Sequence, residues 1–201
     1  LDQTVLPFTE TYLTCTTWQD VHKAISVLAV RGAPAIGVAA AYGVVLGARS
    51  ILEKPGDKPF ITALQDICTN LDGARPTAVN LHWALEQMMA CAKAHGGESP
   101  TAIVHVLEDK AKAIHADDVA INTAMAGWGA DEIGKGDRPL TLLTHCNAGA
   151  LATAGVGTAL GVISELHRRG QVKMVYADET RPLLQGARLT AFELMAGGVR
   201  V

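Results

Sequence analysis

The sequence has few aromatic residues and no excess of positive charge. Phe, Trp and Tyr make up 4% of the 201 residues, and 17 Lys and Arg stand against 20 Asp and Glu, so the formal net charge is -3. Proteins that bind single-stranded nucleic acid stack the bases on aromatic side chains, and nucleic-acid backbones and anionic membranes attract positively charged surfaces. The composition therefore predicts no nucleic-acid partner and no membrane partner.

Long runs of bulky apolar residues are also missing. Two stretches without acidic or basic residues, 32–48 and 139–164, are rich in Gly, Ala and Thr. A membrane-spanning helix needs about 20 predominantly apolar residues, so we interpret both stretches as buried segments of a soluble protein. The first residues have neither the basic segment nor the apolar run of an export signal, which favours a cytoplasmic location.

The cysteines lack the spacing of a zinc site or a disulfide framework. The chain has four, without a C-x-x-C pair: Cys15, Cys68, Cys91 and Cys146. Reduced thiols are therefore expected. His115, Asp117 and Asp118 lie close in sequence on a predicted helix, but without further ligands nearby they indicate a solvated face, so no metal is expected.

The 49% of hydrophobic residues is enough for a substantial core, and the first two thirds of the chain have helical patterns. Residues 1–17 predict a small β-hairpin, because β-prone residues flank a turn at Pro7. Helices are predicted over 18–31, 34–51, 61–71, 76–95 and 99–128. Thr17 is the expected N-cap of the first helix, with Asp20 in its first turn, and Pro34 suits the first turn of the second.

The pattern changes at the Gly- and Pro-containing run 134–139. Beyond it, strands are predicted over 140–144 and 172–177, helices over 151–169 and 188–196, and the start of a third strand over 199–201. Alternating strands and helices indicate parallel strands with crossover helices. We therefore predict an α/β fold with two domains: a mostly helical N-terminal domain with the hairpin (1–133) and an incomplete parallel-sheet domain (134–201).

The carboxyl ends of parallel strands are where open α/β sheets bind ligands. Cys146 follows the first predicted strand and precedes a helix, whose positive end can lower a thiol pKa. A small buried hydrophobe is the equally supported alternative. A direct pair with His145 is not expected, because adjacent side chains near a strand end diverge. Gly155 and Gly157 fall inside the predicted helix, so they indicate close helix packing rather than a dinucleotide fingerprint.

Three arginines each precede the proline that is predicted to begin a helix: Arg31, Arg75 and Arg181. Free N–H groups at a helix start, together with a guanidinium, suit a bound anion. For any one of them alone, a solvated arginine at a turn is the better supported interpretation. The recurrence of the pattern favours a phosphorylated small molecule as the ligand.

Four longer segments carry a resemblance to a known family. They are 30–37 (Val-Arg-Gly-Ala-Pro-Ala-Ile-Gly), 75–81 (Arg-Pro-Thr-Ala-Val-Asn-Leu), 144–153 (Thr-His-Cys-Asn-Ala-Gly-Ala-Leu-Ala-Thr) and 178–190 (Asp-Glu-Thr-Arg-Pro-Leu-Leu-Gln-Gly-Ala-Arg-Leu-Thr). With these segments in this order, the chain resembles the methylthioribose-1-phosphate isomerases. That family shares a superfamily with ribose-1,5-bisphosphate isomerases and the regulatory subunits of translation initiation factor 2B.

The resemblance implies an aldose-ketose isomerase of methionine salvage, with a helical N-terminal domain and a Rossmann-like C-terminal domain. It implies a sugar-phosphate substrate, no cofactor and a homodimer. By this likeness Cys146 is the catalytic cysteine, and the substrate contacts are Arg31, Gly32, Ala33, Arg75 and Gln185. No family role carries over to Arg181.

The resemblance also implies a catalytic aspartate in a Gly-Ala-Asp motif after the third strand, followed by an Asn-Lys substrate contact. Both would lie beyond Val201, and we do not assign the role to Asp131, although Gly-Ala precedes it. The 201 residues are therefore expected to be part of a protein nearly twice as long, and to be inactive alone. The alternatives are a sibling ribose-1,5-bisphosphate isomerase and a non-catalytic regulatory subunit like those of initiation factor 2B.

Overall fold

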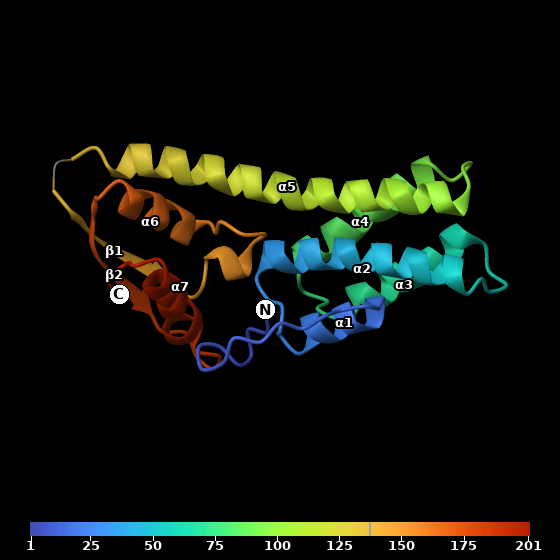
Figure 1. The fold of residues 1–201 in the computed structure, drawn as a ribbon, viewed down its shortest axis with the longest axis horizontal. Helices are drawn as coiled ribbons and strands as arrows, with labels where there is room; N and C mark the ends of the chain where they lie inside the picture. The colour runs from blue at the N-terminus through green and yellow to red at the C-terminus, as the bar shows by residue number, and fades with distance from the viewer. Residues whose placement is uncertain (137) are drawn as a thin grey trace. The chain divides into compact units, whose positions relative to one another are not determined.

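A computed structural model gives the fold and describes residues 1–136 and 138–201. Within these residues the fold is mixed α/β, as predicted, with helices through most of the chain and a parallel pair of strands near its end (Figure 1). The elements are α1 (Trp18–Ser26), α2 (Ala33–Glu53), α3 (Phe60–Asp72), α4 (Val79–Ala94), α5 (Pro100–Ile133), β1 (Leu140–His145), η1 (Ala150–Ala152), α6 (Ala159–Arg168), β2 (Val172–Asp178), η2 (Gly186–Thr190) and α7 (Ala191–Ala196). The short elements η1 and η2 are a 3-10 turn and a π-helical turn.

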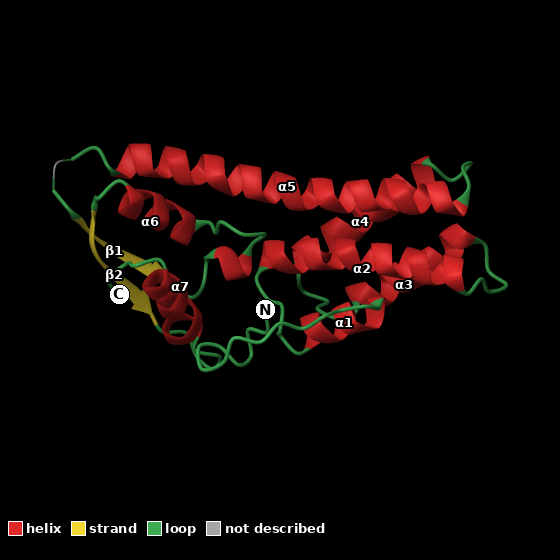
Figure 2. Ribbon diagram, in the orientation of Figure 1, coloured by secondary structure: helices red, strands yellow, loops and turns green. Residues whose placement is uncertain are grey.

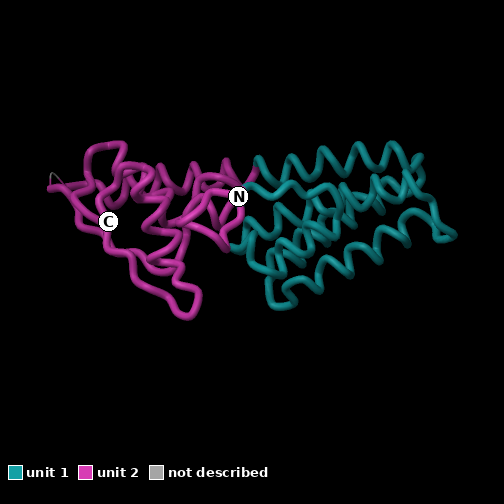
Figure 3. The backbone as a smooth tube through the Cα atoms, turned by 60° about the horizontal axis from the view of Figure 1, so that its bottom comes forward, with its two compact units in different colours: residues 1, 12–116 teal, residues 2–11, 117–201 magenta. Residues whose placement is uncertain are grey.

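The chain divides into two compact units. The described strands all lie in the last third of the chain (Figure 2), and they belong to the second unit (Figure 3). The first unit comprises Leu1 and residues 12–116, and the second comprises residues 2–11 and 117–201. This division falls within α5, whereas the boundary between the predicted domains, 1–133 and 134–201, lies at the C-terminal end of α5. The two predicted domains stay a prediction. Asp137, in the predicted boundary run, lies outside the described residues.

Helix α1 begins where the sequence predicts. Asp20 N donates a hydrogen bond of 3.2 Å to Thr17 Oγ1, and Thr17 N donates one of 2.9 Å to Asp20 Oδ2. This capping box satisfies N–H groups that the helix leaves unpaired. Hydrogen bonds from Thr17 hold the pKa of the Asp20 carboxyl below its usual value. The helix ends at Ser26, earlier than predicted, and Leu28 beyond it has a left-handed backbone (φ 65), which a continuing helix does not allow.

Helix α2 is a core helix of the first unit, and Pro34 stands in its first turn as predicted. Its glycines allow close packing. A Cβ at Gly37 would lie 2.9 Å from the Asn80 carbonyl oxygen of α4, and a Cβ at Gly47 would lie 2.8 Å from Ile67 of α3. By length and composition α2 could cross a membrane. However, 56% of its most apolar stretch of 18 residues is buried within the protein, as in the core helix of a soluble protein.

Strands β1 and β2 form a parallel sheet in the second unit. Their register pairs His145 with Asp178, so the two carboxyl ends coincide. The buried core beside this sheet consists of Leu160, Ile163, Val175, Leu194 and Val199. The predicted third strand is not formed over 199–201; there the Arg200 carbonyl accepts a hydrogen bond of 2.8 Å from Val175 N of β2.

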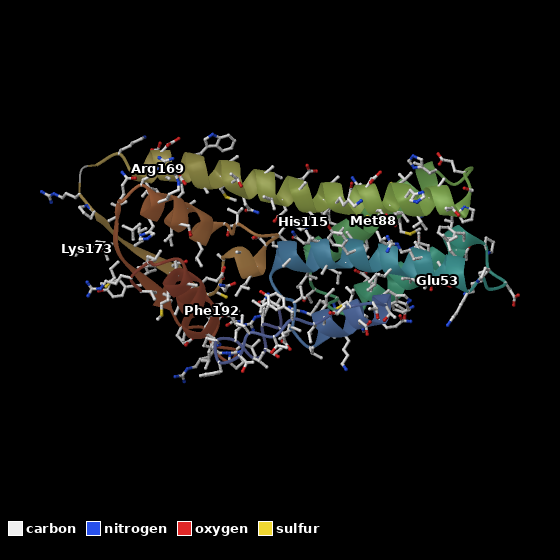
Figure 4. All side chains as sticks on the ribbon, in the orientation of Figure 1. Glu53, Met88, His115, Arg169, Lys173 and Phe192 are labelled. Atoms are coloured by element: carbon white, nitrogen blue, oxygen red, sulfur yellow. The ribbon has the colours of Figure 1, made fainter. Side chains whose placement is uncertain are left out.

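An exposed ion-pair cluster joins α6 to α5 within the second unit. Arg169, at the end of α6 and labelled in Figure 4, donates to Asp131 of α5 (2.6 Å) and to Glu165 (2.9 Å). Arg168 also donates to Glu165. Hydrogen bonds from Arg168 and Arg169 lower the pKa of the Glu165 carboxyl to about 2. Asp131 therefore has a structural partner in Arg169.

The N-terminal segment 2–11 is not the predicted hairpin. No strand forms within residues 1–17, but the predicted turn at Pro7 does: the Val5 carbonyl accepts hydrogen bonds from Phe8 and Thr9, and Asp2 N donates one of 2.7 Å to the Thr11 carbonyl. The side chain of Leu6 is completely buried. The guanidinium of Arg188 donates to the backbone carbonyls of Gln3, Thr4 and Leu6. These carbonyls are thus bound by a side chain rather than by a partner strand.

Replacing Arg188 by alanine is expected to release the segment 2–11. The change removes charge-assisted donors from several backbone carbonyls, so the free energy of unfolding should fall by about 2–3 kcal/mol. Hydrogen exchange of the N-terminal peptide should become faster, measured by mass spectrometry. Exposed Arg181 provides the matched control, and Arg181→Ala should leave this exchange unchanged. Wild-type protection in the Arg188→Ala variant would contradict the tether.

Candidate active site

Cys146 lies directly after β1, at the edge of the sheet where sequence reasoning put it. Its backbone is left-handed (φ 60), which is uncommon for a residue with a Cβ. Its carbonyl oxygen accepts a hydrogen bond of 2.5 Å from the buried Thr190 Oγ1 of η2. The Cys146 side chain is half-buried, whereas Cys68 is fully buried and desolvation raises the pKa of the Cys68 thiol to about 12. Burial also raises the pKa of the thiols of Cys15 and Cys91.

The loop between β1 and α6 depends on glycine. Gly155 (φ 151) and Gly157 (φ 88) have backbone conformations that favour glycine, and a Cβ at Gly157 would lie 2.7 Å from backbone atoms of Gly149. These glycines form the turn before α6, which begins at Ala159. The predicted helix 151–169 is therefore wrong at its start, and so is the interpretation of the glycines as helix-packing positions.

A half-buried carboxylate lies against the loop that follows Cys146. Glu193 of α7 accepts a hydrogen bond of 2.7 Å from Asn147 Nδ2 and one of 3.2 Å from Leu151 N. Burial raises the pKa of this carboxyl, and the hydrogen bonds from Asn147 and the loop backbone act in the opposite direction. Gly149 packs so closely on the carboxylate that a Cβ there would overlap it.

His145 pairs across the sheet rather than with its sequence neighbour. Its Nδ1 lies 3.4 Å from Asp178 Oδ2, at the paired carboxyl ends of β1 and β2. Both side chains are exposed. The expectation that the His145 side chain is not the direct partner of the adjacent cysteine agrees with this contact.

Gln185 lies in the second unit with Cys146, between β2 and η2. Its Oε1 accepts a hydrogen bond of 2.5 Å from Thr180 Oγ1. The next residue, Gly186, packs against the backbone carbonyl of Asp178 so closely that a Cβ would overlap it. The chain can therefore turn back at the end of β2 and begin the π-helical turn that carries Thr190.

The other predicted substrate contacts lie in the first unit, at the start of α2. Arg31 is half-buried and precedes the helix, Gly32 is its N-cap with φ 102, and Ala33 is its first residue. Only a residue without a Cβ takes this N-cap conformation readily. The arginine and the first N–H groups of α2 are adjacent in the chain, as an anion site requires.

Arg75 also lies in the first unit, in a turn before α4. Helix α4 begins at Val79 rather than at Pro76, because the chain first forms a turn in which Ala78 N donates to the Arg75 carbonyl (2.9 Å). The N-terminal parts of α2 and α4 are in contact, because Gly37 packs against the Asn80 carbonyl. Arg31 and Arg75 therefore precede two neighbouring helices.

Residues 181–184 form turns, so the prediction that Pro182 begins a helix is wrong, as it is for Pro76. The chain after β2 first has to reverse its direction at the Asp178 carbonyl, and helical structure starts only at Gly186. Arg181 is exposed.

Residues 29–201 match the sequence profile of the Initiation factor 2 subunit family. The chain belongs to this family. Among curated family relatives, the methylthioribose-1-phosphate isomerase of Pelotomaculum thermopropionicum is 51% identical over 201 residues, which are 100% of this chain and 54% of the relative. The enzyme of the same name from Pseudomonas syringae pv. tomato is 51% identical over 203 residues, with 100% and 55% covered.

Two solved structures share the fold of this initiation factor 2 subunit family member over its whole length. The 5-methylthioribose 1-phosphate isomerase of Pyrococcus horikoshii OT3 has a TM-score of 0.87 at 36% identity, with 55% of that chain covered. Subunit delta of translation initiation factor eIF-2B from A. fulgidus has a TM-score of 0.85 at 39% identity, with 57% covered. The chain thus spans little more than half the length of these relatives.

Sequence reasoning missed two residues of this family member that bind the Cys146 loop, Thr190 and Glu193. Both fall in the predicted helix 188–196, where the acid between Phe192 and Leu194 has the pattern of an ordinary solvated position. The sequence offered no signal that this carboxylate binds a loop more than 40 residues earlier.

Proposed function

We propose that the whole protein containing this chain is an aldose-ketose isomerase that converts 5-methylthioribose 1-phosphate to 5-methylthioribulose 1-phosphate in methionine salvage. The observation that carries the proposal is the 51% identity, over the whole chain, to relatives named methylthioribose-1-phosphate isomerase. The second unit supports it, because Cys146 stands at the carboxyl edge of a parallel sheet, where α/β folds bind ligands.

The reaction moves a hydrogen from C2 to C1 of a sugar whose C1 oxygen carries the phosphate, so the ring has to be opened with acid–base help. Cys146 is the proposed catalytic residue, a thiol or thiolate that acts near C1 and C2 together with a carboxyl group on the other side. This pair suits either proton abstraction or an assisted hydride shift. A site closed to water would protect the intermediate.

The phosphate and the sugar hydroxyls need hydrogen-bond donors. Arg31 and Arg75 would bind the phosphate, with the backbone at Gly32 and Ala33 contributing N–H groups at the start of α2. Gln185 would hydrogen-bond the substrate through its side-chain amide. The reaction as proposed needs no organic cofactor and no metal.

Changing Arg31 or Arg75 to lysine is expected to raise KM for the substrate by about tenfold or more, since a bidentate fork becomes a point charge. Gln185→Ala should have a smaller effect, because a neutral hydrogen bond contributes about 0.5–1.5 kcal/mol net. Steady-state kinetics of the whole protein measures both. Arg49, an exposed arginine paired with Glu108, is the control. Unchanged KM in both lysine variants would make the two arginines structural.

A direct assay of the whole protein tests the proposed activity. Turnover of 5-methylthioribose 1-phosphate, with ribose 1,5-bisphosphate as the comparison substrate, separates the proposed enzyme from its sibling isomerase. A non-catalytic regulatory subunit is the second candidate, because subunit delta of eIF-2B matches this fold with a TM-score of 0.85. Absence of turnover on both sugar phosphates would favour that candidate.

The proposed enzyme is a cytoplasmic homodimer that takes a small sugar phosphate and has no nucleic-acid or membrane partner. The half-buried thiol of Cys146 supports a reducing compartment, because its proposed role needs a free thiol. Analytical ultracentrifugation of the whole protein tests the dimer, and a monomer at micromolar concentration would contradict it.

A further inference from the structure

Glu193 is a half-buried acid that takes no part in the proposed reaction. Its two carboxylate oxygens face the loop after Cys146, where Oε1 binds Asn147 Nδ2 at 2.7 Å and Oε2 binds Leu151 N at 3.2 Å. Withdrawing a carboxylate from water is unfavourable unless such donors satisfy it. The segment next to the cysteine is therefore built around this side chain.

Thr190 binds the same loop from the same face of the helical segment. It lies three residues before Glu193, a spacing that puts both side chains on one side. Thr190 Oγ1 donates to the Cys146 carbonyl at 2.5 Å and accepts from Asn147 Nδ2 at 3.3 Å. Asn147 thus bonds both residues, and the three side chains form one continuous network.

The conformation of Cys146 depends on support of this kind. A residue with a Cβ adopts a left-handed backbone only where its surroundings hold it there, and Cys146 has φ 60. The Thr190 hydroxyl holds its carbonyl group. The carboxylate of Glu193 accepts hydrogen bonds from the side-chain amide of Asn147, the residue after Cys146, and from the backbone of Leu151 in η1.

We propose that Thr190 and Glu193 are positioning residues that hold Cys146 in its left-handed conformation and so fix the direction of its thiol. The inference rests on the proposed function for the importance of that thiol to turnover. The positioning itself is a property of the loop and is measurable without any substrate.

The test compares Thr190→Val, which removes the hydroxyl at nearly constant volume, with Thr190→Ser, which keeps it. Glu193→Gln removes the charge and one acceptor while keeping the shape. Thr123→Val is the matched control, because Thr123 Oγ1 donates a similar bond of 2.7 Å to a backbone carbonyl at an exposed position of α5. Glu132→Gln, at an exposed position, is the control for the acid.

The first readout is the alkylation of Cys146 by iodoacetamide at the high-pH plateau of the rate, followed by peptide mass spectrometry. Thr190→Val and Glu193→Gln should raise the rate by about threefold or more, because the loop opens locally. Thr190→Ser and both controls should keep the wild-type rate. Alkylation of the buried Cys68 would report unfolding, and it should stay slow in every variant. Unchanged midpoints of thermal denaturation should confirm that the variants remain folded.

The second readout is the kinetics of the whole protein with 5-methylthioribose 1-phosphate. Displacement of the thiol should lower kcat by about tenfold to hundredfold in Thr190→Val, with KM nearly unchanged and Thr190→Ser restoring the rate. Wild-type alkylation of Cys146 in folded Thr190→Val and Glu193→Gln would overturn the inference. Altered alkylation in a protein without isomerase activity would uphold the positioning and reject the proposed function instead.

Discussion

Replacing Cys146 by alanine is expected to lower isomerase turnover of the whole protein by about 10²–10⁴-fold, the range for loss of a general acid or base. Folding should remain intact, because alanine and cysteine have the same steric difficulty at φ 60 and the Thr190 bond uses the Cys146 backbone. Steady-state turnover and thermal denaturation measure the two effects separately.

Two further variants sharpen this result. Cys146→Ser replaces the thiol by a hydroxyl of similar size but far weaker acidity. A slow serine variant would therefore show that the thiolate character matters. Cys91→Ala removes a half-buried thiol in α4 and should leave turnover unchanged. A Cys146→Ala enzyme with a near-wild-type rate would remove this thiol from the mechanism.

Gly186→Ala is expected to be the most destabilising small substitution in the second unit. A Cβ at this position would overlap the backbone carbonyl of Asp178, which cannot move without disturbing the end of β2. Overpacking of this kind costs about 2–3 kcal/mol of the free energy of unfolding. Because Gly186 begins η2, the displacement should also reach Thr190 and lower turnover together with stability. Urea denaturation and the isomerase assay measure the two.

Gly127→Ala is the matched control. Gly127 lies inside α5, in the same unit, and a Cβ there would meet nothing within 4 Å. Alanine loses less conformational entropy than glycine in a helix, so this variant should gain about 0.5–1 kcal/mol. Equal stabilities of the two variants would show that the close approach at Gly186 does not constrain the fold.

Elements with local signals were predictable from the sequence. The cap formed by Thr17 and Asp20, the proline in the first turn of α2 and the strand before Cys146 all depend on atoms only a few residues apart. Cys146 could therefore be placed at the carboxyl edge of a sheet before the structure was available. Whether its thiol is buried or accessible could not be derived, because that depends on what packs beside the strand end.

Predictions from local patterns failed where a group distant in the sequence determines the backbone conformation. The β-prone N-terminal segment forms no hairpin, because Arg188, 182 residues from Leu6, binds its carbonyls. The helix expected from Leu151 starts at Ala159, because the chain has to pass closely over Gly149 before it can turn.

The sequence by itself determined the mixed α/β class, the order of most helices and strands, and the position of Cys146 after a strand, since hydrophobic periodicity and capping act over a few residues. Only the tertiary structure decided the left-handed backbone of that cysteine and the network of Thr190, Glu193 and Asn147 around it. These bonds join segments more than 40 residues apart. Their partners are chosen by the packing of η2 and α7 against the loop, which no local sequence pattern encodes.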